Sequence, residues 1–294
     1  MSLALAEFTE YSLIGLLSGG VLALVAMSFV LIYKGTGVVN FAVGEIMMLG
    51  AYLYYTCRVL AGWPLPVSVA VALAGVVLTA LAIERTVLRP LSGQPAIAIL
   101  MATIGISSFL HGLVEAVWGG DTFALPTLLP RTPLTFGDVL ISGTTLWNFA
   151  VAAIVVAAFG LFFRFTRAGV RLRAAASDPV TASTVGIDIR YAQRLTWILS
   201  GLVGTVASLL IATTSGLSPL LSSAALSVFA IIILGGLDSL LGAVVAALLI
   251  GWLEALIVGY VGGKARDVVP YLVVLAVLVV RPYGLFGTRA IERL

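Results

Sequence analysis

Apolar stretches of about twenty residues recur along this chain and constrain its fold more than any other feature. The windows nearly free of charge are residues 13–33, 38–60, 65–83, 96–117, 146–163, 195–214, 223–239, 241–262 and 268–281. About 20 apolar residues in a helix cross a hydrocarbon core about 30 Å thick. With 61% hydrophobic residues the composition excludes a soluble globular domain. We predict an all-α polytopic membrane protein with about eight or nine transmembrane helices, forming one transmembrane domain over residues 1–294.

Glycine and cysteine usage refines this prediction. The chain has 31 glycines, which favour close helix packing and predict that some helices, near residues 38 and 223–245, are interrupted. Its single cysteine, Cys57, excludes an internal disulfide framework. A metal site is not expected, because the lone His111 has no second histidine or cysteine at ligand spacing.

Positive charge is concentrated between two of the apolar windows. Residues 164–194 hold six arginines and two aspartates, whereas 10% of the whole chain is charged. If this loop is cytoplasmic, alternation places twelve basic residues inside: Lys34, Arg85, Arg89, the six loop arginines, Arg281, Arg289 and Arg293. Four lie outside: Arg58, Arg131, Lys264 and Arg266. The positive-inside rule then predicts an outside N-terminus and a cytoplasmic C-terminus.

The longest polar stretch on the opposite side is expected at residues 118–145. It contains Pro126, Pro130 and Pro133, which indicate an irregular extracytoplasmic loop covering the helices.

The basic loop also carries signals for a short helix. Asp178 can cap a helix that begins at Pro179, and Gly186 can end it in a left-handed conformation. We expect a helix over Pro179–Val185, after a basic segment at Gly169–Ala176, with small side chains that fit a groove of a partner. The alternative is that the arginines only fix topology and contact lipid phosphates. The residues expected to couple to a partner are Arg171, Arg173, Asp178, Pro179, Gly186 and Asp188, some of them joined in ion pairs.

Polar residues inside the apolar windows are candidates for a translocation path, because burying them in a membrane is costly. Asn40 and Glu45 lie in the Gly-rich second window. They line or gate a path, or else Asn40 caps a helix and Glu45 bonds to a hydroxyl on a neighbouring helix. Asp238 follows a Gly-Gly pair and either faces a path, pairs with a loop arginine or caps the next helix. Glu254 is a further pathway candidate, or bonds to a neighbouring helix.

Motifs for catalysis and for ATP binding are absent from the sequence. There is no G-x-x-x-x-G-K-[S/T] loop, H-E-x-x-H helix, dinucleotide fingerprint or Ser-His-Asp arrangement. No enzyme activity and no cofactor are therefore expected, and uphill transport needs energy from a partner chain or an ion gradient. An ion-coupled secondary carrier or an intramembrane enzyme stays as the minor alternative.

A series of short motifs resembles one transporter family. The motifs are Asn40-Phe41-Ala42, Gly44-Glu45, Gly50-Ala51-Tyr52, Glu84-Arg85, Leu88-Arg89-Pro90-Leu91, Thr103-Ile104-Gly105-Ile106, Leu172-Arg173-Ala174, Ser177-Asp178-Pro179, Val185-Gly186-Ile187-Asp188, Leu234-Gly235-Gly236-Leu237, Gly242-Ala243 and Arg281-Pro282-Tyr283-Gly284-Leu285-Phe286-Gly287. In this order they resemble the permease subunits of ATP-driven branched-chain amino acid importers, especially the smaller permease. The chain departs from that pattern at Val43, where a histidine is common, and at Asp238 and Leu241, where Gly and Pro are frequent.

The resemblance implies a bacterial inner-membrane complex. Its parts are two different permeases, two cytoplasmic ATPase subunits that contact the loop helix, and a periplasmic solute-binding protein, with no nucleic acid. Related permeases serve urea, short amides and other small solutes, so the same architecture with such a solute is the second hypothesis.

Overall fold

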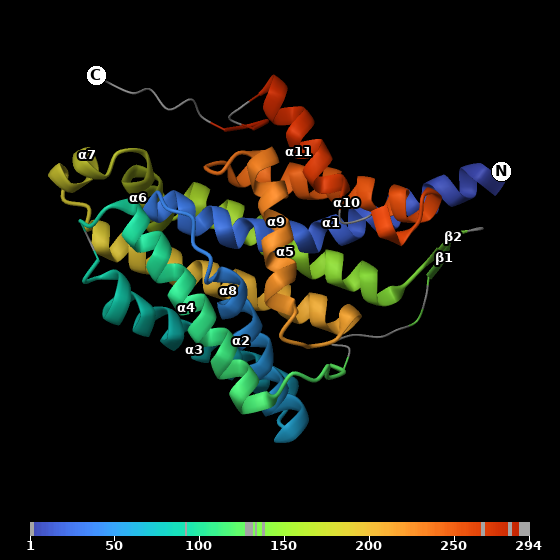
Figure 1. Cartoon of the computed structure of the whole chain (residues 1–294), viewed down its shortest axis with the longest axis horizontal. Helices are drawn as coiled ribbons and strands as arrows, with labels where there is room; N and C mark the ends of the chain where they lie inside the picture. The colour runs from blue at the N-terminus through green and yellow to red at the C-terminus, as the bar shows by residue number, and fades with distance from the viewer. Residues whose placement is uncertain are drawn as a thin grey trace. The chain divides into compact units, whose positions relative to one another are not determined.

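The computed structural model describes residues 3–91, 93–126, 132, 134–136, 139–265, 268–281 and 284–287 (Figure 1). The helices within these ranges are α1 (Leu3–Thr36), α2 (Val43–Tyr55), α3 (Leu65–Ile83), α4 (Ala96–Trp118), α5 (Gly143–Phe165), α6 (Arg167–Ser177), α7 (Pro179–Thr184), α8 (Ile189–Ser215), α9 (Leu221–Gly235), α10 (Leu240–Tyr260) and α11 (Val269–Val280). The π-helical turns η1 (Thr56–Leu60) and η2 (Glu84–Leu88) extend α2 and α3, and η3 (Gly263–Ala265) is a 3₁₀ turn. The orientation prediction also counts Arg131, Arg266, Arg289 and Arg293, which lie outside the described residues, as do Pro130, Pro133, Pro282 and Tyr283.

Among the described residues, six helices are long and apolar enough to cross a membrane: α1, α3 with η2, α4, α5, α8 and α10. The other three predicted windows form shorter apolar helices. Of these, α2 has 13 residues, α9 has 15 and α11 has 12. A helix of 12 residues rises only about 18 Å, less than the hydrocarbon core. The prediction of an all-α polytopic membrane protein is confirmed. Two of the three shortened helices, α2 and α9, lie in the windows for which an interruption was predicted, whereas α11, the shortest, contains no glycine.

The chain divides into two compact units. Unit 1 comprises Met1–Val30, Leu129–Ile154 and Ser227–Leu294, and unit 2 comprises Leu31–Leu128 and Val155–Leu226. Each unit is described separately below.

In unit 2, α2, α3, α4 and α8 lie side by side (Figure 1). Nearly every residue of α2 is buried, which explains why this helix is apolar on all sides. The approach of α2 to α8 depends on Gly50, where a Cβ would lie 2.4 Å from Thr205 Oγ1. Ser208 donates a hydrogen bond of 2.8 Å to the backbone oxygen of Met47 and fixes the register of the pair.

Unit 1 relies on the same device. At Gly251 of α10, a Cβ would lie 2.6 Å from the Cα of Gly19 in α1. Near the other end of the contact, the Tyr11 and Tyr260 rings meet edge to face with centroids 5.6 Å apart. Close backbone contact of this kind replaces the hydrophobic driving force, which is weak between helices in lipid.

The stretch at residues 118–145 is less irregular than expected. β1 (Leu134–Phe136) and β2 (Val139–Ile141) form an antiparallel hairpin in which Leu134 pairs with Ile141. The prediction missed the hairpin because its two strands are only three residues long.

The ends of α8 separate two connecting segments of unit 2. α7 directly precedes its first turn, and Phe123, in the loop after α4, pairs with Leu217 beyond its last turn. Because α8 has 27 residues, these two segments are about 40 Å apart along the helix. The basic loop and the described start of the 118–145 stretch thus lie at opposite ends of unit 2.

Candidate functional site

The short helix in the basic loop is present as α7. Asp178 Oδ1 accepts hydrogen bonds of 3.0 Å from the backbone N–H groups of Val180 and Thr181. Pro179 occupies the first helical position, and Gly186 follows the helix with a φ of +83°. Three local signals therefore define α7, and each acts through the chemistry that the sequence indicated.

The basic segment before α7 is also helical, which the sequence analysis missed. Thr166 caps α6 by accepting a 2.9 Å hydrogen bond from Gly169 N–H. Gly169 is buried, and a Cβ there would lie 2.5 Å from the backbone oxygen of Phe162. Leu172 and Ala175 are buried on the same helix. The available signal was the Thr cap before apolar residues at helical spacing, hidden by a glycine that usually weakens a helix.

The surface of α7 differs from the expected one. Ala182 is buried within the chain, so it is not available to fit a partner's groove. Ser183 and Thr184 are exposed, as are Val180 within the helix at 73% and Val185 directly after it at 71%. Large exposed apolar side chains on such a short helix indicate a contact surface.

Asp188 caps the next helix instead of pairing with an arginine. Its Oδ1 accepts hydrogen bonds of 2.9 and 3.2 Å from the N–H groups of Arg190 and Tyr191 at the start of α8. Among the described residues it forms no ion pair, so the ion pair expected for Asp188 is wrong. The first N–H groups of a helix have no backbone acceptor within the helix, and the Asp188 carboxylate accepts from two of them at the start of α8. The number of charges in the loop could not indicate this role. Arg171 and Asp188 line a small hollow of about 240 Å³ between α6 and α8.

Asn40 is buried in the turn before α2. Its Oδ1 accepts a 2.9 Å hydrogen bond from the N–H of Ala42, which is itself the N-cap residue of α2 and has no side-chain cap hydrogen bond. The capping alternative for Asn40 is therefore wrong, because its side chain closes the preceding turn instead. The side chain is 3% exposed, and no described residue accepts a hydrogen bond from its Nδ2. This turn therefore explains the role of the amide oxygen and leaves the amide nitrogen without a structural role.

Glu45 lies in the first turn of α2 and is also buried. Ser107 of α4 donates a 3.2 Å hydrogen bond to its Oε1, and His111 Nδ1 lies 3.4 Å from its Oε2. The hydroxyl of Ser222 is within hydrogen-bonding reach of the same carboxylate. His111 Nε2 lies 3.5 Å from Glu115, the contact expected from their spacing in α4. His111 thus bridges two carboxylates, and no sequence pattern indicated its contact with Glu45.

The other two pathway candidates belong to unit 1. Asp238 lies in the turn between α9 and α10 and Glu254 within α10, both partly buried. The cap of α10 is Ser239, whose hydroxyl accepts a 3.0 Å hydrogen bond from Gly242 N–H. The capping alternative for Asp238 is therefore wrong, because its neighbour occupies that position.

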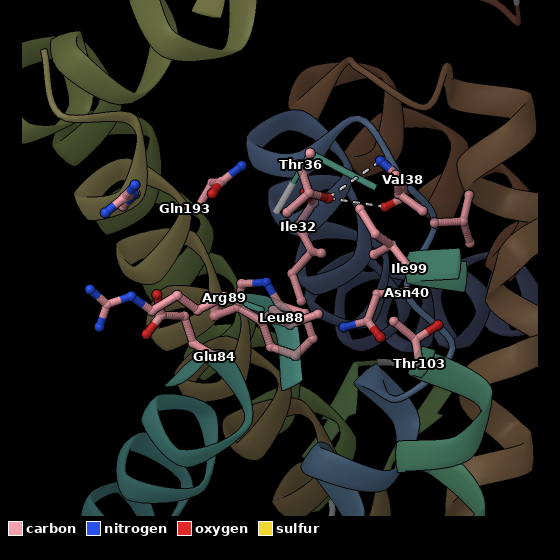
Figure 2. A pocket seen from close by; sticks show the side chains of 14 residues that line it. Ile32, Thr36, Val38, Asn40, Glu84, Leu88, Arg89, Ile99, Thr103 and Gln193 are labelled. Carbon is pink, nitrogen blue, oxygen red and sulfur yellow. Dashed lines mark hydrogen bonds between the residues drawn. The ribbon is translucent and has the colours of Figure 1, made fainter. Parts of the chain in front are cut away.

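A cavity of about 380 Å³ opens in unit 2 beside Asn40. Its lining comes from the end of α1, the loop before α2, η2 and the residues after it, and the first turns of α4 and α8. Figure 2 shows Asn40 and Thr103 on one side of it and Glu84 and Arg89 on the other, with Leu88 between them. Its polar members other than Asn40 are Thr36, Glu84, Arg89, Thr103, Arg190 and Gln193, none of which the sequence indicated as a pathway residue. Charged residues directly after an apolar window are common, so only the fold reveals that they share a cavity.

Within the described part of the chain, no group of three or more His, Cys, Asp or Glu side chains is arranged to hold a metal ion.

Comparison with known proteins decides the family. A family model described as branched-chain amino acid transport system, permease component, matches residues 11–278. The chain belongs to this permease family. The family resemblance drawn from the short motifs is confirmed, and the chain is a transport component, one part of a transport system, and not an enzyme.

Relatives of this permease match it over almost its whole length. It is 31% identical to the high-affinity branched-chain amino acid transport system permease protein BraD of Pseudomonas aeruginosa, with 95% of each chain covered. It is 28% identical to the corresponding protein LivH of Escherichia coli K12, covering 97% of each. A probable branched-chain amino acid transport permease protein of Methanocaldococcus jannaschii is 29% identical over 90% of this chain and 88% of its own.

The fold of this permease also occurs in a solved structure. PsaBC from Streptococcus pneumoniae in complex with Fab contains a chain that matches it with a TM-score of 0.50. The sequences are 15% identical, and the match covers 94% of this chain and 92% of that one. The likeness establishes a shared architecture.

Proposed function

We propose that this permease is the membrane-spanning subunit of an ATP-driven importer of branched-chain amino acids. The observation that carries the proposal is the family match over residues 11–278, together with relatives named as branched-chain amino acid permeases along nearly their full length. The whole chain acts as one transmembrane permease domain and supplies half of the translocation pore.

The energy for import comes from partner chains. The sequence has no phosphate-binding loop, so ATP hydrolysis belongs to two cytoplasmic ATPase subunits. A second, homologous permease completes the pore, and an extracytoplasmic binding protein delivers the amino acid.

α7 is the element that meets an ATPase subunit. It exposes Val180 and Val185, while Arg171 and Arg173 of the preceding α6 are exposed nearby in sequence. Exposed apolar side chains with basic residues close by in the sequence suit a partner surface whose rim is acidic. A helix of six residues is not stable alone, so its cap and the burial of Ala182 hold it ready for this contact.

The N-terminus lies outside and the C-terminus in the cytoplasm of a bacterial plasma membrane. This orientation places the basic residues of the 164–194 loop in the cytoplasm, as the positive-inside rule requires. Asn40, Glu45, Asp238 and Glu254 line or gate the path.

The test is uptake of radiolabelled leucine into vesicles that contain this permease with its candidate partner permease, ATPases and binding protein. We expect uptake that requires both ATP and the binding protein. A matched preparation with a hydrolysis-deficient ATPase should take up none.

Two results would reject parts of the proposal. ATP-dependent uptake of urea or acetamide but not of leucine would support an ATP-driven importer and reject branched-chain amino acids as its solute. Uptake that does not require ATP and stops when the proton or sodium gradient is removed would reject the ATP-driven importer in favour of an ion-coupled carrier.

A further inference from the structure

The cavity beside Asn40 combines an apolar interior with a basic mouth. Ile32 and Trp197, which line it, are only 1% and 2% exposed. Arg89 and Arg190 line the same cavity and are exposed, so they mark where it reaches the surface. Its volume of about 380 Å³ lies within the range of small-molecule sites, roughly 300–1,000 Å³.

The charge in the cavity wall is not balanced by the chain. Glu84 is buried, and its Oε2 lies 3.4 Å from Arg194 Nε, so this carboxylate already has a cationic partner. Neither Arg89 nor Arg190 forms an ion pair with any described side chain. Two arginines therefore stand at the mouth without a counter-charge, which favours an anionic ligand.

Asn40 adds a second feature that a ligand of this cavity would have to match, a buried hydrogen-bond donor. Its Nδ2 is buried without an acceptor among the described residues, and Figure 2 shows the amide nitrogen directed towards Leu88 across the cavity. A buried donor without an acceptor destabilises the folded chain, because it has lost its hydrogen bonds to water. A ligand oxygen that accepts from Asn40 Nδ2 would remove this penalty. Because its Oδ1 is already held by Ala42 N–H, the amide cannot simply turn over to remove the problem.

We propose that this cavity binds a small aliphatic carboxylate that carries a second acceptor oxygen at the far end of its chain, the chemistry of glutarate. The carboxylate meets Arg89 and Arg190 at the mouth, the methylene chain packs on Leu88 and Trp197, and the far oxygen accepts a hydrogen bond from Asn40 Nδ2. The second oxygen belongs either to another carboxylate or to an amide.

The site lies at a defined end of unit 2. Arg190 and Gln193 belong to the first turns of α8, which begins directly after α7. The cavity therefore opens at the end that carries α6 and α7 and samples the compartment into which they project. The inference goes beyond the proposed import function, and it does not depend on the imported solute.

The test is equilibrium binding of radiolabelled glutarate to the full chain, purified in phosphatidylcholine nanodiscs with whatever subunits accompany it. Glutarate should bind saturably. Arg190→Gln should weaken binding about tenfold, since a charged hydrogen bond is lost from an exposed side chain that does not hold the fold. The matched control is Arg85→Gln, an exposed arginine of η2 outside the cavity lining, which should leave the affinity unchanged.

Asn40→Asp tests the deep contact, because it keeps the oxygen that accepts from Ala42 and replaces the donor by an acceptor. Glutarate affinity should fall at least tenfold in this variant. Pentanoate, which lacks the second oxygen, should bind the original chain about tenfold more weakly than glutarate and lose little more in the variant. Glutaramate, the monoamide, separates the two sources of the second oxygen, and it should compete with glutarate if an amide oxygen suffices.

Specific outcomes overturn the proposal. They are no saturable glutarate binding, equal affinity for pentanoate and glutarate, or glutarate affinity that Arg190→Gln leaves intact. The measurement uses neither ATP nor leucine, so a failed import assay leaves this result standing, and a failed binding assay leaves the import function standing.

Discussion

At the scale of single residues, the buried polar cluster around Glu45 is the clearest link between sequence and transport. Ser107 and His111 both face its carboxylate from α4. Such groups are expensive inside a membrane protein and persist where they serve a path or join helices. The two roles make different demands, since a path depends on the charge and a structural bond needs only an acceptor.

Replacing Glu45 by Gln separates these roles. The amide keeps an oxygen for Ser107 and removes the negative charge beside His111. We expect ATP-driven uptake per folded permease to fall severalfold while the protein remains in the membrane. Uptake in reconstituted vesicles measures the first quantity and the amount of solubilised, monodisperse complex the second.

Glu115→Gln is the control for this variant, because Glu115 is the other carboxylate that contacts His111 but is more than half exposed, at 52%. It should leave uptake close to that of the original chain. Unchanged flux in Glu45→Gln would return this carboxylate to a purely structural role.

At the scale of helices, close contacts through glycine set the packing of α2 on α8. Gly50→Ala introduces a Cβ that would lie 2.4 Å from Thr205 Oγ1 and 2.7 Å from its Cγ2. Overpacking of this kind costs about 1–3 kcal/mol. We expect a lower unfolding temperature, read by a thiol-reactive dye that reaches Cys57, the chain's one cysteine, only when the protein opens, because Cys57 is buried.

Two comparisons sharpen this prediction. Gly105→Ala in α4 meets nothing within 4 Å and should raise stability by about 0.5–1 kcal/mol, through helix propensity alone. Adding Thr205→Ala to Gly50→Ala removes both clashing atoms and should restore part of the loss. Equal effects of the Gly50 and Gly105 variants would contradict the packing account.

α7 offers a second prediction at this scale. Asp178→Ala removes the cap that satisfies two N–H groups and should cost the helix about 1 kcal/mol. Asp178→Asn keeps an acceptor and should be much milder. Since a six-residue helix has little stability of its own, we expect Asp178→Ala to leave ATP hydrolysis running while leucine uptake falls. Simultaneous assays of phosphate release and uptake measure this uncoupling.

Gly186 provides an independent check on α7. Gly186 has a φ of +83°, and a Cβ built on it would meet no atom within 4 Å. Any loss of stability from a side chain there would therefore come from backbone strain alone. Gly186→Val should uncouple the transporter, and Gly186→Asn should be tolerated better, because Asn adopts left-handed conformations more readily. Normal transport in both Gly186→Val and Asp178→Ala would rule out α7 as the docking helix.

At the scale of the whole molecule, orientation in the membrane is open to direct measurement. Ser177 in the basic loop and Asp121 in the loop after α4 are both exposed, and they lie beyond opposite ends of α8. In a Cys57→Ser background, Ser177→Cys should react with a membrane-impermeant maleimide only after the membrane is opened. Asp121→Cys should react in intact cells. The reverse pattern would invert the proposed topology.

Much of the architecture follows from the sequence alone. Apolar windows identify membrane helices because the bilayer leaves a backbone few other options. Asp178, Pro179 and Gly186 specify α7 because capping and turn chemistry act within a few residues. Local patterns also led to wrong or missing predictions. α6 was not predicted because Gly169 lowers the helix propensity of that segment, and the cap of α10 is Ser239, although its neighbour Asp238 has equally suitable chemistry.

The tertiary structure decided everything that depends on residues far apart in the chain. His111 meets Glu45, 66 positions away, because α2 and α4 pack in one particular register. From the sequence, Asn40 could line a path or cap a helix, and only the packed structure shows that its amide nitrogen lies beside a cavity without an acceptor among the described residues. Helix formation and capping are governed by neighbours in sequence, whereas cavities and buried polar contacts are set by how side chains interdigitate between helices. The family and the membrane fold could therefore be predicted from the sequence, whereas the arrangement of the site is determined by the tertiary packing of the helices.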